Sequence, residues 1–302
     1  MILLIGIPSE TPLRLLAEAC RSKHLPYTIF SQREQGYWQV GEDPTGEALL
    51  GNGQASFRLA DCSGLYLRTM DQTRVPEYMA AEDTTSIDNM YQRLFRALDE
   101  ERSCRVVNAP AVQMSNNSKP YQSLIIRQCG LDIPEMCITS CVDEAESFLA
   151  RYPAAIYKSI SGSRSIVKRV DADALRNLYK IKYCPVQFQE QVTGFNVRVH
   201  VIGERVIATR ICSDAVDYRY AKTEGLSATL QPYCLSPELA YKCINLSKRL
   251  QLPFAGIDLM MTGDGRTVCF EVNPSPGYSY YELSTGQPIS HALADYLAGE
   301  VV

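Results

Sequence analysis

The sequence predicts an α/β protein that begins with a small parallel-sheet domain and continues into a strand-rich region. Residues 3–30 alternate strand, helix and strand, and short apolar strands dominate from residue 155 onward. With 302 residues, of which 46% are hydrophobic and 21% charged, the chain has the composition of a globular protein and the length of roughly two domains.

The opening consists of a strand at residues 3–7, a helix at 12–23 with its apolar residues at helical spacing, and a strand at 27–30. This order is also typical of dinucleotide-binding domains. The turn at residues 6–10, however, lacks the glycine spacing that lets the backbone approach a pyrophosphate. We therefore expect a parallel-sheet domain without a nicotinamide or flavin site.

The remainder of the first unit is predicted to contain a strand pair, a long helix and a closing segment, at residues 57–69, 86–102 and 106–110. A polar turn at 115–118 then has the character of a helix N-cap. The helix that follows starts at Lys119 and is stopped by Gly130 and Pro134. These signals place a domain boundary near residue 112.

Strands dominate the second half of the chain, at residues 156–159, 166–170, 186–192, 196–201 and 205–211. Turn residues at 193–194 and 202–204 separate the last three strands, which predicts a meander. A helix at 237–250 precedes a hairpin, and a last helix is expected at 289–298.

Composition argues against several functional classes. The net charge of −4 disfavours a general nucleic-acid binder, and no apolar run approaches the roughly 20 residues needed to span a bilayer. Residues 1–6 lack a basic n-region, so they are read as a strand and not as a signal peptide.

The 11 cysteines form no Cys-x-x-Cys pair, which indicates free thiols in a reducing cytoplasm, and 3 histidines are too few for a zinc site. No Gly-x-Ser-x-Gly motif is present, so a serine hydrolase is not expected.

The hairpin within residues 254–276 carries the most informative pattern. Asp264 and Gly265 are the favoured pair for a two-residue type I′ turn. With that loop, Asp258 faces Glu271 and Gly256 faces Asn273, so that two carboxylates and an amide share one face. The other face is uniformly apolar and contains Ile257, Leu259, Met261, Val268, Phe270 and Val272.

Carboxylates that face each other repel, and a bound cation would relieve the repulsion. Three oxygen donors with room for phosphate and water suit Mg²⁺, which makes Asp258, Glu271 and Asn273 candidate metal ligands. A solvated hairpin with an acidic outer face is the alternative interpretation of the same pattern.

Residues 256–259 and 271–277 resemble the metal-binding end of the ATP-grasp superfamily, and the match continues through Glu282 and residues 285–289. Within that superfamily the chain is most similar to the ribosomal-protein glutamate ligase (RimK-like) branch and to the ligases that macrocyclise graspetide (microviridin-type) peptides. The resemblance covers roughly residues 113 to 300. It implies an ATP-grasp fold with a central lobe at 113–188 and a C-terminal lobe at 189–302, behind an N-terminal pre-ATP-grasp α/β domain at 1–112.

The resemblance also implies a set of phosphate-binding residues. Lys119 and Lys158 fall where the family places its phosphate ligands, and an ammonium group acts there as a point charge. A small-residue loop that contains Ser161 and Gly162 follows Lys158 and would close over the phosphates. The loop of the family is usually richer in glycine.

Residues 188–192 resemble the hinge strand between the two lobes, which adds Gln189, Glu190 and Gln191 to the nucleotide site, with the backbone around the last two reading the adenine edge. Asn196 stands where the family usually has Asp, and it can still accept a hydrogen bond from ribose.

Two arginines, Arg198 and Arg219, correspond to catalytic-site positions of the family. A guanidinium at Arg219 would stabilise negative charge on the transferring phosphoryl group and on the tetrahedral intermediate. Where the family often has Asn two residues later, this chain has Ala221 followed by Lys222, which can substitute as a cationic contact.

The implied chemistry uses ATP with Mg²⁺, or Mn²⁺ in its place, to activate a carboxylate as an acyl-phosphate that an amine or hydroxyl then attacks. Ser275 to Tyr278 stand where graspetide ligases often have a Trp-containing stretch, which favours a glutamate-adding ligase or another peptide-tailoring relative over a macrocyclase. Tyr278, Tyr280 and Tyr281 are candidates for stacking on a peptide or for packing. Two other functional classes stay open, namely an ATP-binding regulatory protein without catalysis and a structural interaction module. The sequence also leaves open whether the protein forms a homo-oligomer.

Overall fold

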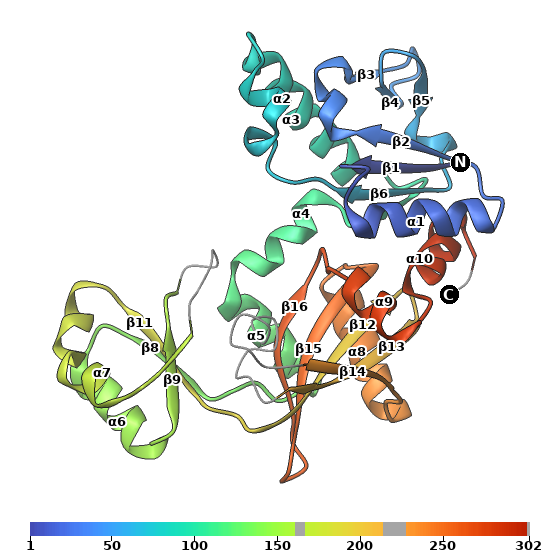
Figure 1. Ribbon diagram of the computed structural model, residues 1–302. Helices are drawn as coiled ribbons and strands as arrows, with labels where there is room; N and C mark the ends of the chain where they lie inside the picture. Colours follow the sequence, from blue (N-terminus) through green and yellow to red (C-terminus); the bar gives the residue numbers. More distant parts are fainter. Residues whose placement is uncertain (161–166, 214–227, 301–302) are drawn as a thin grey trace.

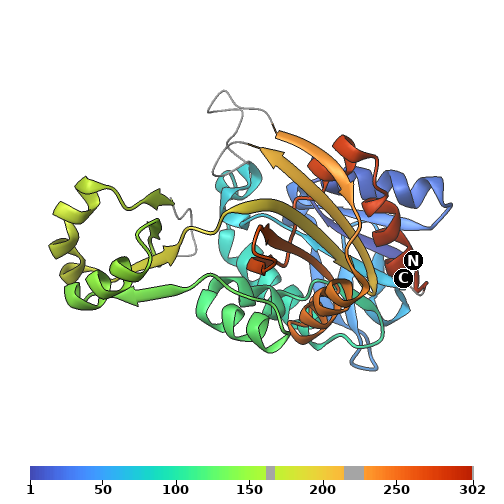
Figure 2. The same cartoon turned by 90° about the horizontal axis from the view of Figure 1, so that it is seen from below.

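The computed structural model describes residues 1–160, 167–213 and 228–300. Figures 1 and 2 show three parts: a first domain, a C-terminal lobe directly beside it, and a central lobe, residues 136–190, that lies to one side and is joined to the rest by two chain crossings. Within these described residues, no helix is long and apolar enough to cross a membrane. All of the 11 cysteines are free thiols, as predicted.

The first domain is built on a parallel sheet with the strand order β2-β1-β6-β7. Its strands are β1 (Ile2–Gly6), β2 (Tyr27–Ser31), β6 (Gly64–Arg68) and β7 (Arg105–Val107). Side chains of β1 alternate between two cores, one with α1 (Thr11–Ser22) and one with α3 (Thr84–Glu100). A central strand covered on both faces explains why every residue of β1 is buried.

A second, antiparallel sheet is inserted between β2 and β6. It contains β3 (Gln39–Glu42), β4 (Ala48–Gly51) and β5 (Ser56–Arg58). The strand pair predicted within residues 57–69 is therefore wrong as a pair, because β5 and β6 belong to different sheets. Short helical segments complete the domain: η1 (Gln32–Tyr37), η2 (Leu59–Asp61), η3 (Gln72–Arg74) and α2 (Pro76–Met79).

A helical connection leads from the first domain to the lobes. It consists of α4 (Pro110–Gln113), η4 (Met114–Asn117) and α5 (Lys119–Gln128). Ser118 occupies the N-cap position of α5, as the sequence predicted, although its side chain makes no capping hydrogen bond. Pro120 lies in the first turn of α5, where its missing N–H leaves no hydrogen bond unmade.

The central lobe is a sheet with the order β10-β9-β11-β8 and short helices against it. Its elements are β8 (Met136–Thr139), α6 (Val142–Arg151), β9 (Ala155–Lys158), β10 (Lys168–Arg169), α7 (Ala172–Arg176), η5 (Leu178–Tyr183) and β11 (Val186–Glu190). The predicted meander is confirmed for β12 (Gly194–Ile202) and β13 (Arg205–Ser213), which pair across the turn at 203–204. It is wrong for β11, which pairs with β8 and β9, and residues 191–193 cross to the other lobe without forming a tight turn.

The C-terminal lobe is a five-stranded antiparallel sheet with the order β14-β13-β12-β15-β16. Its strands are β12 (Gly194–Ile202), β13 (Arg205–Ser213), β14 (Ala228–Tyr233), β15 (Phe254–Thr262) and β16 (Thr267–Asn273). One face packs against α5 and α8 (Pro237–Arg249), and part of the other against α9 (Ser279–Thr285) and α10 (Ile289–Ala298).

The first domain and the C-terminal lobe share one hydrophobic core. It runs from Leu4 and Leu16 in the first domain to Phe254 and Leu293 in the lobe, and α1 lies beside α10 (Figure 1). Gly64 makes this approach close, because a Cβ at this position would lie 2.5 Å from the carbonyl oxygen of Leu297. The two units on either side of the predicted boundary at residue 112 are thus packed as one body, whereas the central lobe has its own core.

Candidate active site

The β15–β16 hairpin brings the three predicted metal ligands together. Asp258 pairs with Glu271 and Gly256 with Asn273, which is the register predicted from the sequence. Because side chains alternate along a strand, Asp258, Glu271 and Asn273 lie on one face of the hairpin. The sheet face around them is the one that α9 and α10 cover only in part.

The turn of this hairpin differs from the predicted two-residue loop. Toward the tip, Met261 pairs with Thr267, one position away from the register that such a loop would give. The loop has three residues, 263–265, and Gly265 adopts the left-handed conformation with φ 87°. A bulge next to the Asp258–Glu271 pair adds one residue to β16 and restores the predicted register further along.

The same bulge changes which residues of β16 face the core. Phe270 was predicted to be a core residue, but it is half-buried, and the fully buried Cys269 takes its place in the core. The extra residue interrupts the alternation, so two neighbouring residues exchange roles. Ile257 and Val272 are buried as predicted.

Arg198, predicted to be catalytic, lies on β12 directly opposite Asp258. It is buried, and its Nη1 donates a hydrogen bond of 2.7 Å to Oδ1 of Asp258. Its guanidinium also stands over the ring of Tyr281, 5.7 Å from the centroid. Gly256 makes the space for it, because a Cβ there would lie 2.2 Å from Nη2 of Arg198.

Helix α5 brings two side chains to β16. Lys119, at its first position, donates a hydrogen bond of 3.1 Å from Nζ to Oε2 of Glu271. One turn later Gln122 is buried and bonds both backbone groups of Val272, with Nε2 donating to the carbonyl at 2.7 Å and Oε1 accepting from the N–H at 2.9 Å. Gln122 thus fixes the residue between Glu271 and Asn273. Its helical spacing from Lys119 is the sequence signal that could have found it.

Lys158 ends β9 and reaches the same region from the central lobe. Its Nζ donates a hydrogen bond of 3.0 Å to Oε1 of Gln189, a residue also predicted for the nucleotide site. Burial, together with the ammonium group of Lys119, lowers the pKa of Lys158 to about 8, and Glu271 acts in the opposite direction. The hydrogen-bond partner of Lys158 is thus a neutral amide, whereas that of Lys119 is a carboxylate.

The hinge strand ends at Glu190, and its backbone is already partly bonded. The N–H of Glu190 donates to the carbonyl of Glu135 at 2.9 Å, and the N–H of Gln191 donates to the carbonyl of Ala154 at 3.0 Å. An adenine edge at this hinge would therefore have to use carbonyl groups or the N–H of the following residue, Val192. The side chain of Glu190 is buried and bonds to Arg266, a contact that the sequence did not suggest.

Of the other predicted residues, Asn196 is half-buried on the same face of β12 as Arg198, opposite Met260. Ser161, Gly162, Arg219 and Lys222 lie outside the described residues. Tyr278 and Tyr281 pack in the core, where the hydroxyl of Tyr278 donates to the carbonyl of Pro12, whereas Tyr280 is exposed.

The first domain holds the loop that follows Asn273. Arg68, at the end of β6, donates from Nη1 to Oγ of Ser275 at 3.3 Å and to the carbonyl of Pro276 at 3.2 Å. Its Nε bonds Glu10 at 3.1 Å. Asn273 itself accepts the N–H of Ser275 at 2.9 Å. The carboxyl edge of the first sheet therefore supports the predicted metal end.

The donor set fits a magnesium ion in chemistry, since Asp258, Glu271 and Asn273 offer hard oxygen ligands from facing positions of two strands. Among the residues that the structure describes, no group of three or more His, Cys, Asp or Glu side chains could hold a metal ion. The predicted set is not such a group, because its third member, Asn273, contributes an amide oxygen. Both carboxylates already form ion pairs, Asp258 with Arg198 and Glu271 with Lys119, so a metal ion would have to share or displace these partners.

Solved structures resemble the chain along its whole length. The ATP-grasp ligase PsnB, complexed with a minimal precursor, Mg and ADP, is 25% identical with a TM-score of 0.81, covering 100% of this chain and 97% of that one. A RiPP-associated ATP-grasp ligase of Chryseobacterium gregarium, in complex with ADP and a leader and core peptide, is 20% identical with a TM-score of 0.82, covering 99% of this chain and 96% of that one. The second likeness shows the fold.

Among curated relatives, a probable alpha-L-glutamate ligase of Haemophilus influenzae is 27% identical over 198 residues, which are 60% of this chain and 63% of that protein. The first relatives found are matched over 37% and 54% of their own length, so the chain spans less than two thirds of them. Residues 115–297, more than half of the chain, match the RimK-like ATP-grasp domain. This chain belongs to the RimK-like ATP-grasp family.

Proposed function

We propose that this chain is an ATP-dependent ligase that activates a carboxylate as an acyl-phosphate and joins it to an amine or hydroxyl. The observation that carries the proposal is the polar face of the β15–β16 hairpin, where Asp258 lies opposite Glu271 and Lys119 from α5 bonds Glu271. A triphosphate placed between the lobes would meet the ammonium groups of Lys119 and Lys158 and the oxygen donors of the hairpin.

In the proposed reaction a carboxylate oxygen attacks the γ-phosphorus of ATP, and ADP leaves. The nucleophile then attacks the acyl carbon, loses its proton, and phosphate leaves.

Asp258, Glu271 and Asn273 would hold Mg²⁺, or Mn²⁺ in its place, and the ion would neutralise phosphate charge. Lys119 and Lys158 would bind phosphate oxygens, and the backbone of residues 189–192 with Asn196 would hold the nucleoside. Arg198 orients Asp258 through their hydrogen bond, and we assign Arg219, Ser161 and Gly162 to the transferring phosphoryl group from the family pattern.

We assign the nucleotide site to the junction of the central lobe, residues 136–190, and the C-terminal lobe together with α5, which packs on its sheet, with residues 1–112 as a supporting domain. The first candidate for the substrate is a ribosomally made precursor peptide, joined through its own side chains. Support comes from the full-length likeness to PsnB, which was solved with a precursor. Addition of glutamate to a peptide or protein is the second candidate, supported by the glutamate ligases among the relatives.

Mass spectrometry of candidate peptides incubated with the protein, Mg²⁺ and ATP tests the proposal. A cross-link within one peptide appears as the loss of one water per bond, whereas ligation of glutamate adds one glutamate residue, and each event yields one ADP. Nucleotide binding without ADP formation for any peptide or amino acid would favour an ATP-binding regulatory protein. If no nucleotide binds, the proposal is wrong.

A further inference from the structure

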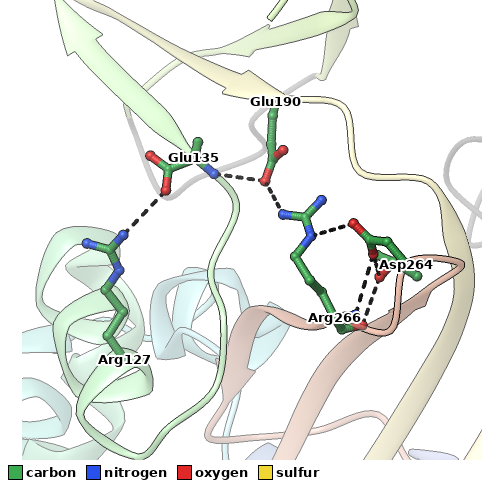
Figure 3. A network of polar contacts seen from close by, with 6 residues as sticks. Arg127, Glu135, Glu190, Asp264 and Arg266 are labelled. Atoms are coloured by element: carbon green, nitrogen blue, oxygen red, sulfur yellow. Dashed lines mark hydrogen bonds and ion pairs between the residues drawn. The ribbon is translucent and has the colours of Figure 1, made fainter.

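The tip of the β15–β16 hairpin contacts the hinge between the lobes (Figure 3). Arg266, which directly follows the hairpin loop, donates from Nη1 to Oε1 of Glu190 at 3.2 Å. Its Nε bonds Oδ2 of Asp264 at 3.1 Å, and Asp264 also accepts the backbone N–H of Arg266. The guanidinium is thus held by its own loop in the orientation that reaches Glu190.

Both chain crossings between the lobes meet at Glu190. The outgoing crossing, residues 129–135, ends at Glu135, whose N–H donates to Oε1 of Glu190 at 3.1 Å and whose carbonyl accepts the N–H of Glu190 at 2.9 Å. The returning crossing starts directly after Glu190. The outgoing crossing is also bonded to the hairpin, since the N–H of Asp132 donates to the carbonyl of Thr267 at 3.2 Å.

In the ion pair between Arg266 and Glu190, the carboxylate is much less exposed to solvent than the guanidinium. The side chain of Glu190 is 11% exposed, whereas that of Arg266 is 42% exposed. A buried carboxylate that loses its charged partner keeps its desolvation cost, so removal of Arg266 would leave Glu190 with one backbone donor at the hinge. Arg266 is therefore the group that allows a buried charge to stay at the junction of the two crossings.

We propose that Arg266 is a positioning residue that sets the angle between the lobes by tying the hairpin tip to Glu190. This inference rests on the proposed function, because a nucleotide between the lobes would contact the central lobe at Lys158 and the hairpin at Glu271. One hairpin then carries the metal ligands along its strands and the hinge contact at its tip. Fixing the hinge places both ends of the nucleotide site at the correct separation before the nucleotide enters.

Calorimetric titration with ADP and Mg²⁺ provides the test, because it needs no knowledge of the peptide substrate. The change Arg266→Gln is expected to weaken ADP binding about tenfold, since the loss of a charged partner by a buried group is worth about one decade in an equilibrium constant. Arg266→Lys keeps the charge within reach of Glu190 and is expected to retain most of the affinity. In turnover assays the KM for ATP should rise more than kcat falls.

The matched control is Arg127→Gln in the same network (Figure 3). Arg127 bonds Glu135 at 3.5 Å, but the two side chains are 61% and 51% exposed, so this pair contributes little. The control should bind ADP like the wild type. Hydrogen exchange of residues 129–135 and 190–194 in the nucleotide-free protein should quicken in Arg266→Gln alone, a readout that remains informative if affinity measurements are limited by stability.

The inference is wrong if Arg266→Gln lowers the melting temperature but leaves ADP affinity and exchange at the crossings unchanged, or if Arg127→Gln has the same effect. If the wild type binds ADP and the variant binds equally well, the inference fails while the proposed function stands. If the wild type binds no nucleotide, both are overturned.

Discussion

The C-terminal lobe and the central lobe each bring one predicted phosphate-binding lysine to their shared side, and they balance its charge differently. Lys119 is paired with Glu271 at 3.1 Å, and the other carboxylate of the hairpin is paired with Arg198 at 2.7 Å. Lys158 instead bonds the neutral amide of Gln189, and burial lowers its pKa to about 8. The charges of the C-terminal lobe are thus paired with one another, whereas the central lobe presents a half-buried lysine beside a neutral partner.

This difference indicates that the two lobes contribute to binding in different ways. An anion that approaches Lys158 gains a cation that the protein itself has not neutralised, so this lysine should respond most to a bound phosphate. In the hairpin, ligand binding must instead rearrange ion pairs that already exist. In this structure, Arg198 and Lys119 hold the two carboxylates in place.

Glu271→Ala is expected to have the largest effect on the hairpin, where both carboxylates are paired with cations. It removes a predicted metal ligand and the partner of Lys119, so ATP turnover with Mg²⁺ should fall by about a hundredfold or more. Urea unfolding should change little, because Glu271 is partly exposed. Glu204→Ala is the control, because this carboxylate also pairs with a lysine, Lys248, but its side chain is 65% exposed. Undiminished turnover in Glu271→Ala would refute the metal assignment.

Gly256→Ala tests whether Arg198 must reach Asp258. The new Cβ would lie 2.2 Å from Nη2 of Arg198 and 2.7 Å from Cβ of Pro276, so the guanidinium has to move. Overpacking of this kind costs about 1–3 kcal/mol of folding free energy, and turnover should fall with it. Gly263→Ala, on the same hairpin with no neighbour within 4 Å of its added Cβ, should match the wild type in denaturant unfolding and turnover. Equal behaviour of the two variants would show that the Arg198 contact is dispensable.

The pH dependence of ADP binding tests the role of Lys158, the lysine whose hydrogen-bond partner is neutral. With the pKa of Lys158 at about 8, its charge is lost as the pH rises from 7 to 9, and affinity should fall by up to about tenfold. Lys158→Arg stays charged throughout this range and should remove that part of the dependence. A profile of the same shape in both proteins would assign the titration to another group.

The same lysine affects stability with the opposite sense. The unfolded chain keeps an ordinary lysine pKa near 10.5, so the folded protein releases this proton first. Stability of the nucleotide-free protein attributable to Lys158 therefore rises between about pH 8 and 10.5. Chemical unfolding of the wild type and of Lys158→Arg across this range measures the difference.

Local sequence signals were sufficient for most elements and for the facing pairs of the hairpin. The Asp258–Glu271 register was predicted although the loop length was wrong, because a bulge beside this pair compensates for the longer turn. Neither the bulge nor the exchange of Cys269 for Phe270 in the core is visible in an alternating pattern. A two-residue turn and a three-residue turn with Gly in the left-handed position share the same Asp-Gly signal.

Contacts between distant segments were beyond sequence reasoning. Asp258 was expected to be relieved by a metal ion alone, yet Arg198 faces it from β12, and strand pairing across such a separation leaves no local signature. The assignment of β11 to a meander failed for the same reason, since Thr193 and Gly194 can form a turn between paired strands or lie where the chain crosses from one lobe to the other. The hinge contact of Arg266 with Glu190 likewise depends on how two lobes meet.

The core shared by the first domain and α10 has a consequence for the order of folding. The central lobe is one continuous stretch of chain with its own apolar cluster, so it can fold as soon as it has left the ribosome. The remaining body contains Leu4 and Leu293 in one cluster and cannot close until nearly all of its sequence has been translated. During synthesis, the central lobe would therefore be folded while the segments before and after it, which together form the remaining body, are still unfolded.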